Sequence, residues 1–357
     1  MTTARTAVEQ VTTWLAVEPL DTIMVRDGRQ FDAGDAGAAT AVAPPPSTLG
    51  GAVGAALGEG ASGGHRADEL VGPFLAVAGD PRFPTPQDIT LDDDADVHRL
   101  AARPAHPDER TDLSGSLSHL LVGPGDPVGG YLDTDGLTDW LSGDGELAPG
   151  HSARPAWWRE RLVGAPWYGE RRVGLARRVE GEFADTADPG MLYAATHLRP
   201  VEDMGFVVGC VASGPLAVVD DLVPLGGRGR LATVRVCDPP ELPAMPRDFP
   251  DGRVAVCLAT PALLGDVRWQ PAGARLCAMA LGGPQTVATA SPREGLWRTR
   301  RLRWAVPAGT VYYLDFGSAE AAGAWARRHH GRLLPGQIGE PIVHAGFGTC
   351  LVGRWMA

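Results

Sequence analysis

Lysine is absent from this chain of 357 residues, so all 32 of its lysine-or-arginine positions are arginines. An arginine guanidinium is planar, and it suits both bidentate contacts with phosphate and stacking on nucleobases. Acidic side chains outnumber the arginines by 43 to 32, and the formal net charge of −11 argues on bulk charge against a nucleic-acid partner. Because the arginines gather in blocks, their distribution along the chain is more informative about partners than the net charge.

Cysteine is also scarce. The five cysteines stand far apart and form no C-x-x-C pair, so the sequence predicts neither a zinc site nor a disulfide framework. No apolar run approaches the roughly 18 residues of a membrane-spanning helix. Arg5 and Glu9 interrupt the apolar pattern near the N-terminus, which argues against a signal peptide. We therefore expect a cytoplasmic protein with reduced thiols and without a metal, a cofactor or a membrane partner.

Glycine and proline are abundant, with 47 and 31 residues, but they stay below the roughly 25–30% that is typical of low-complexity chains. The chain is long enough for two domains, which we expect at 1–190 and 191–357. Proline, aspartate and glycine dominate from Pro81 to Gly150, which predicts long loops or insertions.

Strand and helix patterns alternate without a long regular βαβ repetition, so the pattern indicates an α+β protein. Ser318 is expected to cap a helix that ends near Arg328. Apolar runs predict strands at 14–17, 23–25, 74–78, 191–198, 206–211, 254–259, 310–316 and 347–355, and a short helix at 137–141.

The first predicted strands lead into a segment suited to phosphate. They deliver arginines to a turn, and three prolines then precede Ser47 and Thr48, which we expect to cap a helix. Arginine side chains and the free N–H groups of a helix start both bind phosphate. The candidate residues of this segment are Arg26, Gly28, Arg29, Ser47 and Thr48.

A second candidate is the run Gly226-Gly227-Arg228-Gly229-Arg230. Glycines allow close backbone approach to a ligand, and successive N–H groups can form an anion nest. The letters fit a G-x-G-x-x-A dinucleotide motif, but β-rich residues follow, so no helix N-terminus faces this turn. On local grounds a tight hairpin and a phosphate-binding loop remain equally open.

Arginines and aromatic residues are interleaved from His151 to Arg178, and Arg171 and Arg172 lie in this block. Such interleaving suits single-stranded RNA through phosphate pairing and base stacking. A solvated face with tryptophans packed on the core is an equally good interpretation. Near the C-terminus, Gly346 and Gly348 flank Phe347, and this loop is either an RNA contact or a glycine-lined strand entry.

No catalytic constellation is evident among the nine histidines, because neither H-x-x-x-H nor H-E-x-x-H occurs. The letters of a G-x-S-x-G elbow occur once, from Gly60 to Gly64, but without the strand and helix that a nucleophile elbow requires. The residues alone therefore predict no active site.

Several motifs in one order resemble the third subunit of the Cmr complex, the type III-B CRISPR effector, within the RAMP superfamily. That family opens with PLD…RDG-R-F and continues with a proline-rich P-S-T-L-x-G helix start. It carries an LGG-x-G-R segment, usually with an acidic residue where this chain has Arg228, and a PAG-[ST]-VY segment. The matching residues are Pro19, Leu20, Asp21, Arg26, Asp27, Gly28, Arg29, Phe31, Pro46, Ser47, Thr48, Leu49 and Gly51, then 190–193, 225–230 and 307–312.

The resemblance implies two ferredoxin-like, RNA-recognition-type domains and a non-catalytic subunit. Such a subunit would grip the 5′ handle of the guide crRNA, dock the large polymerase-like subunit and touch the first backbone subunit of the filament. A RAMP-type endoribonuclease that processes precursor guide RNA is the alternative. A third interpretation is a small-molecule enzyme that uses the 226–230 loop.

Overall fold

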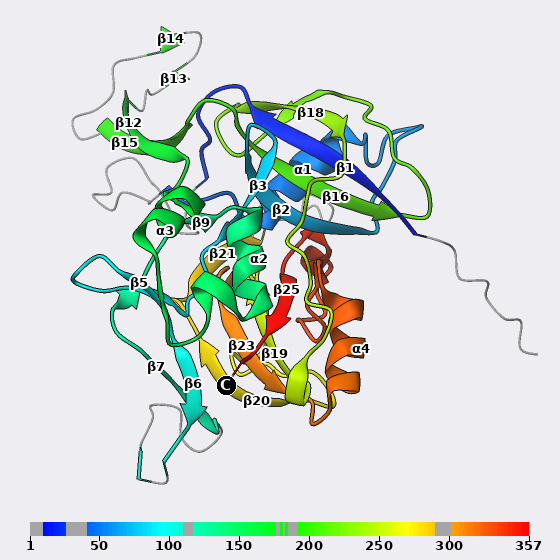
Figure 1. Ribbon diagram of the computed structural model, residues 1–357. Helices are drawn as coiled ribbons and strands as arrows, with labels where there is room; N and C mark the ends of the chain where they lie inside the picture. The colour runs from blue at the N-terminus through cyan, green and yellow to red at the C-terminus, as the bar shows by residue number, and fades with distance from the viewer. Residues whose placement is uncertain are drawn as a thin grey trace, which may run out of the picture.

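The computed structural model describes residues 10–25, 41–106, 108–109, 117–175, 179–180, 183–184, 192–289 and 301–356. Antiparallel sheets dominate these ranges and helices are few, which confirms the predicted α+β class. Figure 1 shows one sheet in the upper half of the molecule and a second in the lower half, with the green and cyan middle of the chain alongside them. The helices are α1 (Pro46–Ala56), α2 (Thr134–Ser142), α3 (Pro155–Arg161) and α4 (Ala319–His329).

The upper sheet has eight strands, and all of its pairings are antiparallel. It combines strands from both sides of residue 190. The division of the chain into domains at 1–190 and 191–357 stays a prediction. In spatial order the strands are β11 (Leu162–Val163), β9 (Tyr131–Leu132), β3 (Asp80–Pro84), β2 (Glu69–Val77), β16 (Met204–Ala212), β1 (Val11–Pro19), β18 (Leu231–Cys237) and β17 (Leu222–Pro224).

The lower sheet has five strands, also antiparallel throughout. Ser318 caps α4 as predicted, since its hydroxyl accepts a hydrogen bond from the Ala321 N–H at 3.2 Å. In spatial order the strands are β20 (Arg275–Ala280), β23 (Val311–Asp315), β19 (Arg253–Leu258), β25 (Thr349–Arg354) and β24 (Arg332–Leu333).

The same strand order occurs in both sheets. When four neighbouring strands of each sheet are ranked by chain order, β2-β16-β1-β18 and β20-β23-β19-β25 both follow second, third, first, fourth. The upper sheet has its helix, α1, between the first and second of these strands. The lower sheet has its helix, α4, between the third and fourth. The two halves thus share a topology but keep different crossover helices.

Alternation along β1 decides which face of the upper sheet α1 covers. Leu15 and Val17 are buried with Leu49 and Val53 of the helix, and each fully buried side chain of this kind contributes roughly 1.5–3 kcal/mol. Ala16 and Glu18, which alternate with them along the strand, point to the opposite face. One face of the sheet is therefore closed by α1, and the other takes part in the groove described below.

The segment from Pro81 to Gly150 forms several short strands and helix α2, so the prediction of long loops is wrong, whereas the alternative prediction of an insertion stays a prediction. It supplies Phe83, Ile89 and Trp140 to a core that also contains residues of both large sheets. Its strands are too short to produce visible periodicity.

The remaining elements are β4 (Ile89–Leu91), β5 (Val97–Arg99), β6 (Ala101–Pro104), β7 (His119–Val122), β8 (Asp126–Pro127), β10 (Ser152–Ala153), β12 (Trp167–Leu175), β13 (Val179–Glu180), β14 (Phe183–Ala184), β15 (Leu192–Pro200), β21 (Gln285–Thr289), β22 (Arg301–Ala305), η1 (Gly145–Leu147), η2 (Pro250–Gly252) and η4 (Pro341–Ala345).

Two further local predictions are wrong. The segment 23–25 forms no strand and makes only isolated bridges. Neither Ser47 nor Thr48 caps α1, because Pro45 occupies the N-cap and the helix begins at Pro46. Proline is favoured at the first helical position, since its fixed φ matches the helix and it has no N–H to satisfy.

Among the described residues, none of the helices has the length and apolar character needed to span a bilayer. In the same ranges, no group of three or more histidine, cysteine or acidic side chains is placed to hold a metal ion. Four of the five cysteines are buried and all are free.

Candidate nucleic-acid interface

Four segments from distant parts of the sequence lie side by side at one end of β1. Strands β12 and β15 pair along their whole length and stand out from the body at the upper left of Figure 1. Ile23 exchanges two backbone hydrogen bonds with Leu198 of β15, at 2.8 and 2.9 Å. Met24 bridges to Gly226, and the Gly227 N–H donates to the Met24 carbonyl at 2.8 Å. We call β12, β15, residues 21–24 and the turn 225–230 the arginine platform.

Three arginines of the platform share two carboxylates. Asp21 lies 2.6 Å from Arg199, 2.5 Å from Arg230 and 3.6 Å from Arg172. Glu170 lies 2.6 Å from both Arg172 and Arg199. Among the described residues, three guanidinium groups share two carboxylates, which leaves a positive excess there, and these side chains are only partly buried. The cluster is therefore pre-oriented but still open to a further anion.

Both carboxylates stay ionised well below neutral pH. Partial burial raises the pKa of Asp21, but the hydrogen bond from the Thr22 N–H and the pairing with Arg199 outweigh it and lower the pKa overall. Hydrogen bonds from Arg172 and Arg199 lower the pKa of Glu170. These two acids consequently orient the guanidinium groups at every pH near neutrality.

One histidine lies within the same cluster. His197 is 3% exposed, and its Nδ1 is 3.0 Å from the Thr22 hydroxyl. Burial lowers its pKa, and the nearby charges of Arg172 and Arg230 lower it further, so the ring is neutral at pH 7. Sequence reasoning missed this residue because only the strand register, which places His197 opposite Glu170, brings it to the arginines.

The turn at 226–230 is a hairpin between β17 and β18, as one of the two predicted alternatives had it. Its first residue, Gly226, has φ +78°, and a Cβ there would lie 2.6 Å from the Met24 carbonyl oxygen. Glycine is therefore required where the turn touches residue 24. The next three residues are exposed, and Arg228 also has a positive φ of +59°. Because β18 follows, the rejected dinucleotide motif has no helix, as predicted.

The predicted residues Arg26, Gly28 and Arg29 lie outside the described residues. The chain on either side of them is fixed, since the Val42 N–H donates to the Val25 carbonyl at 3.1 Å. Val25 directly follows the residue that bridges to Gly226, so the described residues Val25 and Val42 lie beside the platform. Ser47 and Thr48 lie in the first turn of α1, and the Thr48 N–H is already bonded to the Pro45 carbonyl at 2.9 Å.

Arg171 and Arg172 point to opposite faces of the β12–β15 ribbon, because successive strand residues alternate. Arg171 is exposed and outside the cluster. Gly346 and Gly348 are buried. A Cβ on Gly346 would lie 1.9 Å from the Gly72 oxygen of β2, so this loop packs against the upper sheet. An RNA contact at these two glycines stays a prediction.

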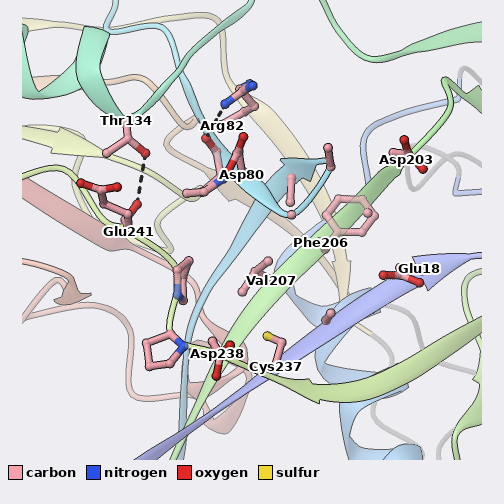
Figure 2. Close-up of a pocket in the computed structure, with 18 of the residues that line it drawn as sticks. Glu18, Asp80, Arg82, Thr134, Asp203, Phe206, Val207, Cys237, Asp238 and Glu241 are labelled. Carbon is pink, nitrogen blue, oxygen red and sulfur yellow. Dashed lines mark hydrogen bonds between the residues drawn. The ribbon is translucent and has the colours of Figure 1, made fainter.

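The face of the upper sheet opposite α1 opens into an acidic groove of about 820 Å³ (Figure 2). Its sheet floor comes from β1, β2, β16 and β18, and Thr134 at the start of α2 donates a hydrogen bond to the Glu241 carbonyl at 3.1 Å across one wall. Seven carboxyl side chains but only two arginines line it, and one arginine, Arg235, is paired with Glu18 at 2.6 Å. The acidic residues are Glu18, Asp80, Asp133, Asp135, Asp203, Asp238 and Glu241.

A smaller hollow of about 560 Å³ adjoins the acidic groove and reaches the platform. Glu18 and Asp203 line both hollows, whereas Asp21 and Arg199 line only the smaller one. Charge is therefore separated on neighbouring surfaces, with arginines at the end of β1 and carboxylates over the sheet. Phosphate is favoured at the first and disfavoured at the second.

The family model "CRISPR-associated protein (Cas_Cmr3)" matches residues 15–355. No curated protein matches. Two similar solved chains are each 15% identical, cover 84% of this chain and are themselves 86% covered, with TM-scores of 0.48 and 0.46. They come from cryo-EM structures of the type III-B Cmr-beta bound to cognate target RNA, the first also with AMPPnP (state 1).

Proposed function

This chain belongs to the Cmr3 family of CRISPR-associated proteins, which confirms the family predicted from the sequence, and on that premise we propose that it is an RNA-binding scaffold subunit of a type III-B effector. It grips the 5′ handle of the guide RNA at the arginine platform. The observation that carries this proposal is the convergence of Arg172, Arg199 and Arg230 on Asp21, from three segments of the chain.

Each half of the molecule is, in this proposal, a ferredoxin-like domain that has lost one helix. The ferredoxin-like fold alternates β-α-β-β-α-β and forms an antiparallel sheet. The shared order of four neighbouring strands in the two sheets supports this assignment. So does the position of α1 after the first strand in one half, and of α4 after the third strand in the other.

The platform holds the backbone of the handle, while contacts with unstacked handle bases supply the preference for the native handle sequence. One arginine can bind two phosphate oxygens at once, and such contacts position a strand without carrying sequence information. Target sequence is then read by pairing with the guide. Arg26 and Arg29, which the sequence predicts as RNA contacts, stay part of this proposal, because Val25, the described residue before them, follows the bridge from Met24 to Gly226. The exposed turn with Arg228 belongs to the same platform.

The subunit is non-catalytic in this proposal. General acid–base cleavage of RNA needs a donor and an acceptor placed on either side of the scissile phosphate. His197 is the one histidine within the described cluster, and it is nearly fully buried and bonded to Thr22. The alternative, an endoribonuclease that processes precursor guide RNA, makes a different prediction: incubation with repeat RNA yields defined products, and His197→Ala abolishes them.

The acidic groove faces protein rather than RNA. Its seven carboxyl side chains outnumber the arginines that pair with them, so this face repels phosphate and complements a basic protein surface. We assign this face to the large polymerase-like subunit, with the first backbone subunit of the filament beside it. The smaller hollow, which joins the groove to the platform, would then bring protein and RNA contacts close together.

The direct experiment is RNA competition on the assembled effector. Guides with the native handle should outcompete guides with a scrambled handle. Arg230→Ala should weaken guide binding and reduce the slope of log K against log salt concentration by about one, the value for one lost phosphate contact. Arg268→Ala is the matched control, because Arg268 is exposed and pairs only locally with Asp266 at 3.0 Å. Equal affinity for native and scrambled handles would refute the proposal.

A further inference from the structure

Two adjacent aromatic residues at the start of β12 have different environments. Trp167 packs edge-to-face against Tyr131 with the ring centroids 6.0 Å apart, and it is partly buried against the core of the upper sheet. Its neighbour Tyr168 is 60% exposed. Strand alternation explains the difference, because successive side chains point to opposite faces. The ribbon thus buries one ring and presents the other to solvent.

Tyr168 lies on the face of the ribbon that carries the arginine cluster. The register of β12 and β15 pairs Tyr168 with Arg199, Glu170 with His197 and Arg172 with Ala195. Residues paired this way share one face, with Cβ atoms about 4.5–5.5 Å apart. The exposed phenol ring therefore stands beside Arg199, whose guanidinium group is fixed by Asp21 and Glu170.

We propose that Tyr168 is a stacking site for one unpaired nucleobase, with the adjoining phosphate held by Arg199 and its neighbours. This inference rests on the proposed function and adds the class of ligand at this spot: a single-stranded nucleotide rather than duplex. In a duplex the base faces are covered, whereas an unstacked base can lie on an aromatic ring. Because Tyr168 and Arg199 are directly opposite on adjacent strands, the base and the phosphate of one nucleotide can contact both side chains.

The chemistry of the ligand follows from the pairing of ring and charge. An exposed aromatic ring alone would suit many apolar partners. A ring next to arginines that are already oriented by carboxylates suits a ligand with a flat face and an attached anion. Stacking is tolerant of base identity, because every base has a π-face, so Tyr168 contributes affinity and register rather than sequence recognition.

The test combines Tyr168 variants with guides that lack one base of the handle at a time. Guide binding to the assembled effector is measured for the unmodified protein, Tyr168→Ala and Tyr168→Phe. Tyr168→Ala should weaken binding roughly 5–150-fold, the usual range for loss of one stacked base, and Tyr168→Phe should retain most of the affinity. At one abasic position the Tyr168→Ala penalty should vanish, because the stacked base is already missing.

Val173→Ala is the matched control, since Val173 is 69% exposed on the opposite face of the same ribbon. Tyr168→Ala that binds like Val173→Ala would overturn the inference and leave the proposed function intact. A penalty that persists undiminished at every abasic position would also overturn it, because the ring would then contact something other than a base. Failure of the unmodified protein to prefer the native handle would refute the proposed function itself.

Discussion

Asp21 and Arg230 are 209 positions apart in the sequence, yet a carboxylate oxygen of the first lies 2.5 Å from a guanidinium nitrogen of the second. The contact joins the end of β1 to the hairpin before β18. Asp21 also holds Arg199, so a single carboxylate sets the positions of two arginines from different segments. This makes Asp21 a positioning residue for phosphate contacts rather than a contact itself.

Asp21→Asn should separate affinity from specificity. Loss of the carboxylate raises the positive charge of the platform, so binding of unrelated RNA at low salt should strengthen. The arginines lose their common anchor, so the preference for the native handle over a scrambled one should fall. Filter binding of both RNAs across a salt series measures the two effects. An unchanged preference would show that Asp21 does not position the arginines.

Asp88 and Arg99 form an ion pair whose side chains are fully buried, with Nε and Oδ2 3.0 Å apart. Asp88 also accepts hydrogen bonds from Trp140 at 3.0 Å and from the Tyr313 hydroxyl at 2.6 Å, so it joins α2 to the lower sheet. Asp88→Ala leaves a buried guanidinium without a counter-charge and should cost about 3–5 kcal/mol of the free energy of unfolding. Urea denaturation measures this loss.

Tyr313→Phe is the control for Asp88→Ala, because it removes one hydrogen bond and leaves the ion pair. We expect a loss of about 1–3 kcal/mol from this change. Equal destabilisation by the two variants would contradict a dominant role for the buried charge pair.

His330 predicts a dependence of stability on pH. Its Nε2–H donates to the Pro243 carbonyl at 3.0 Å, and its Nδ1 accepts from the Val352 N–H at 3.1 Å, an arrangement that only a neutral ring can make. Burial lowers the pKa of His330, and its hydrogen bonds offset this only in part. Below about pH 6.5 the unfolded chain binds a proton that the folded chain does not, so stability falls by about 1.4 kcal/mol for each unit of the pKa difference.

Thermal unfolding between pH 5 and 8 should therefore show a midpoint that is highest above pH 6.5 and declines below it. His119, His197 and His329 also have lowered pKa values and contribute in the same direction. His330→Gln should make the decline shallower. A decline of the same steepness in that variant would remove His330 from the explanation.

The acidic groove predicts a separation of protein and RNA binding. Asp238→Arg combined with Glu241→Arg reverses charge at two positions that line the groove but not the hollow next to the platform. Association with the large subunit should weaken at least tenfold, while affinity for the guide stays unchanged. Asp93→Arg with Asp94→Arg, on an exposed turn, is the matched control for added charge. Equal losses from the two double variants would contradict the assignment of the groove.

Much of the local structure follows from the sequence. Ser318 caps α4 where a hydroxyl precedes a helical pattern, and the glycine run at 226–230 is a hairpin turn because strand-forming residues flank it. The predicted helix at 137–141 lies within α2. In these cases the interactions that decide the structure lie within a few residues of each other, so local patterns predict them.

The platform itself could be predicted only in part. Arg172, Arg230 and the 226–230 turn are candidates from the sequence, whereas Arg199 is not. Their association depends on bridges between Ile23 and Leu198 and between Met24 and Gly226. Such pairings are set by long-range register, which no local pattern reveals. For the same reason Asp21 and His197 were not recognised as part of the site.

Photocrosslinking in the assembled effector measures the position of the guide most directly. A guide with 4-thiouridine substituted within its 5′ handle is irradiated, and crosslinked peptides of this chain are identified by mass spectrometry. Handle binding at the platform predicts crosslinks to peptides of β12, β15 or the turn 225–230, and their loss in Arg230→Ala. Crosslinks confined to the acidic groove, or none to this chain, would contradict it.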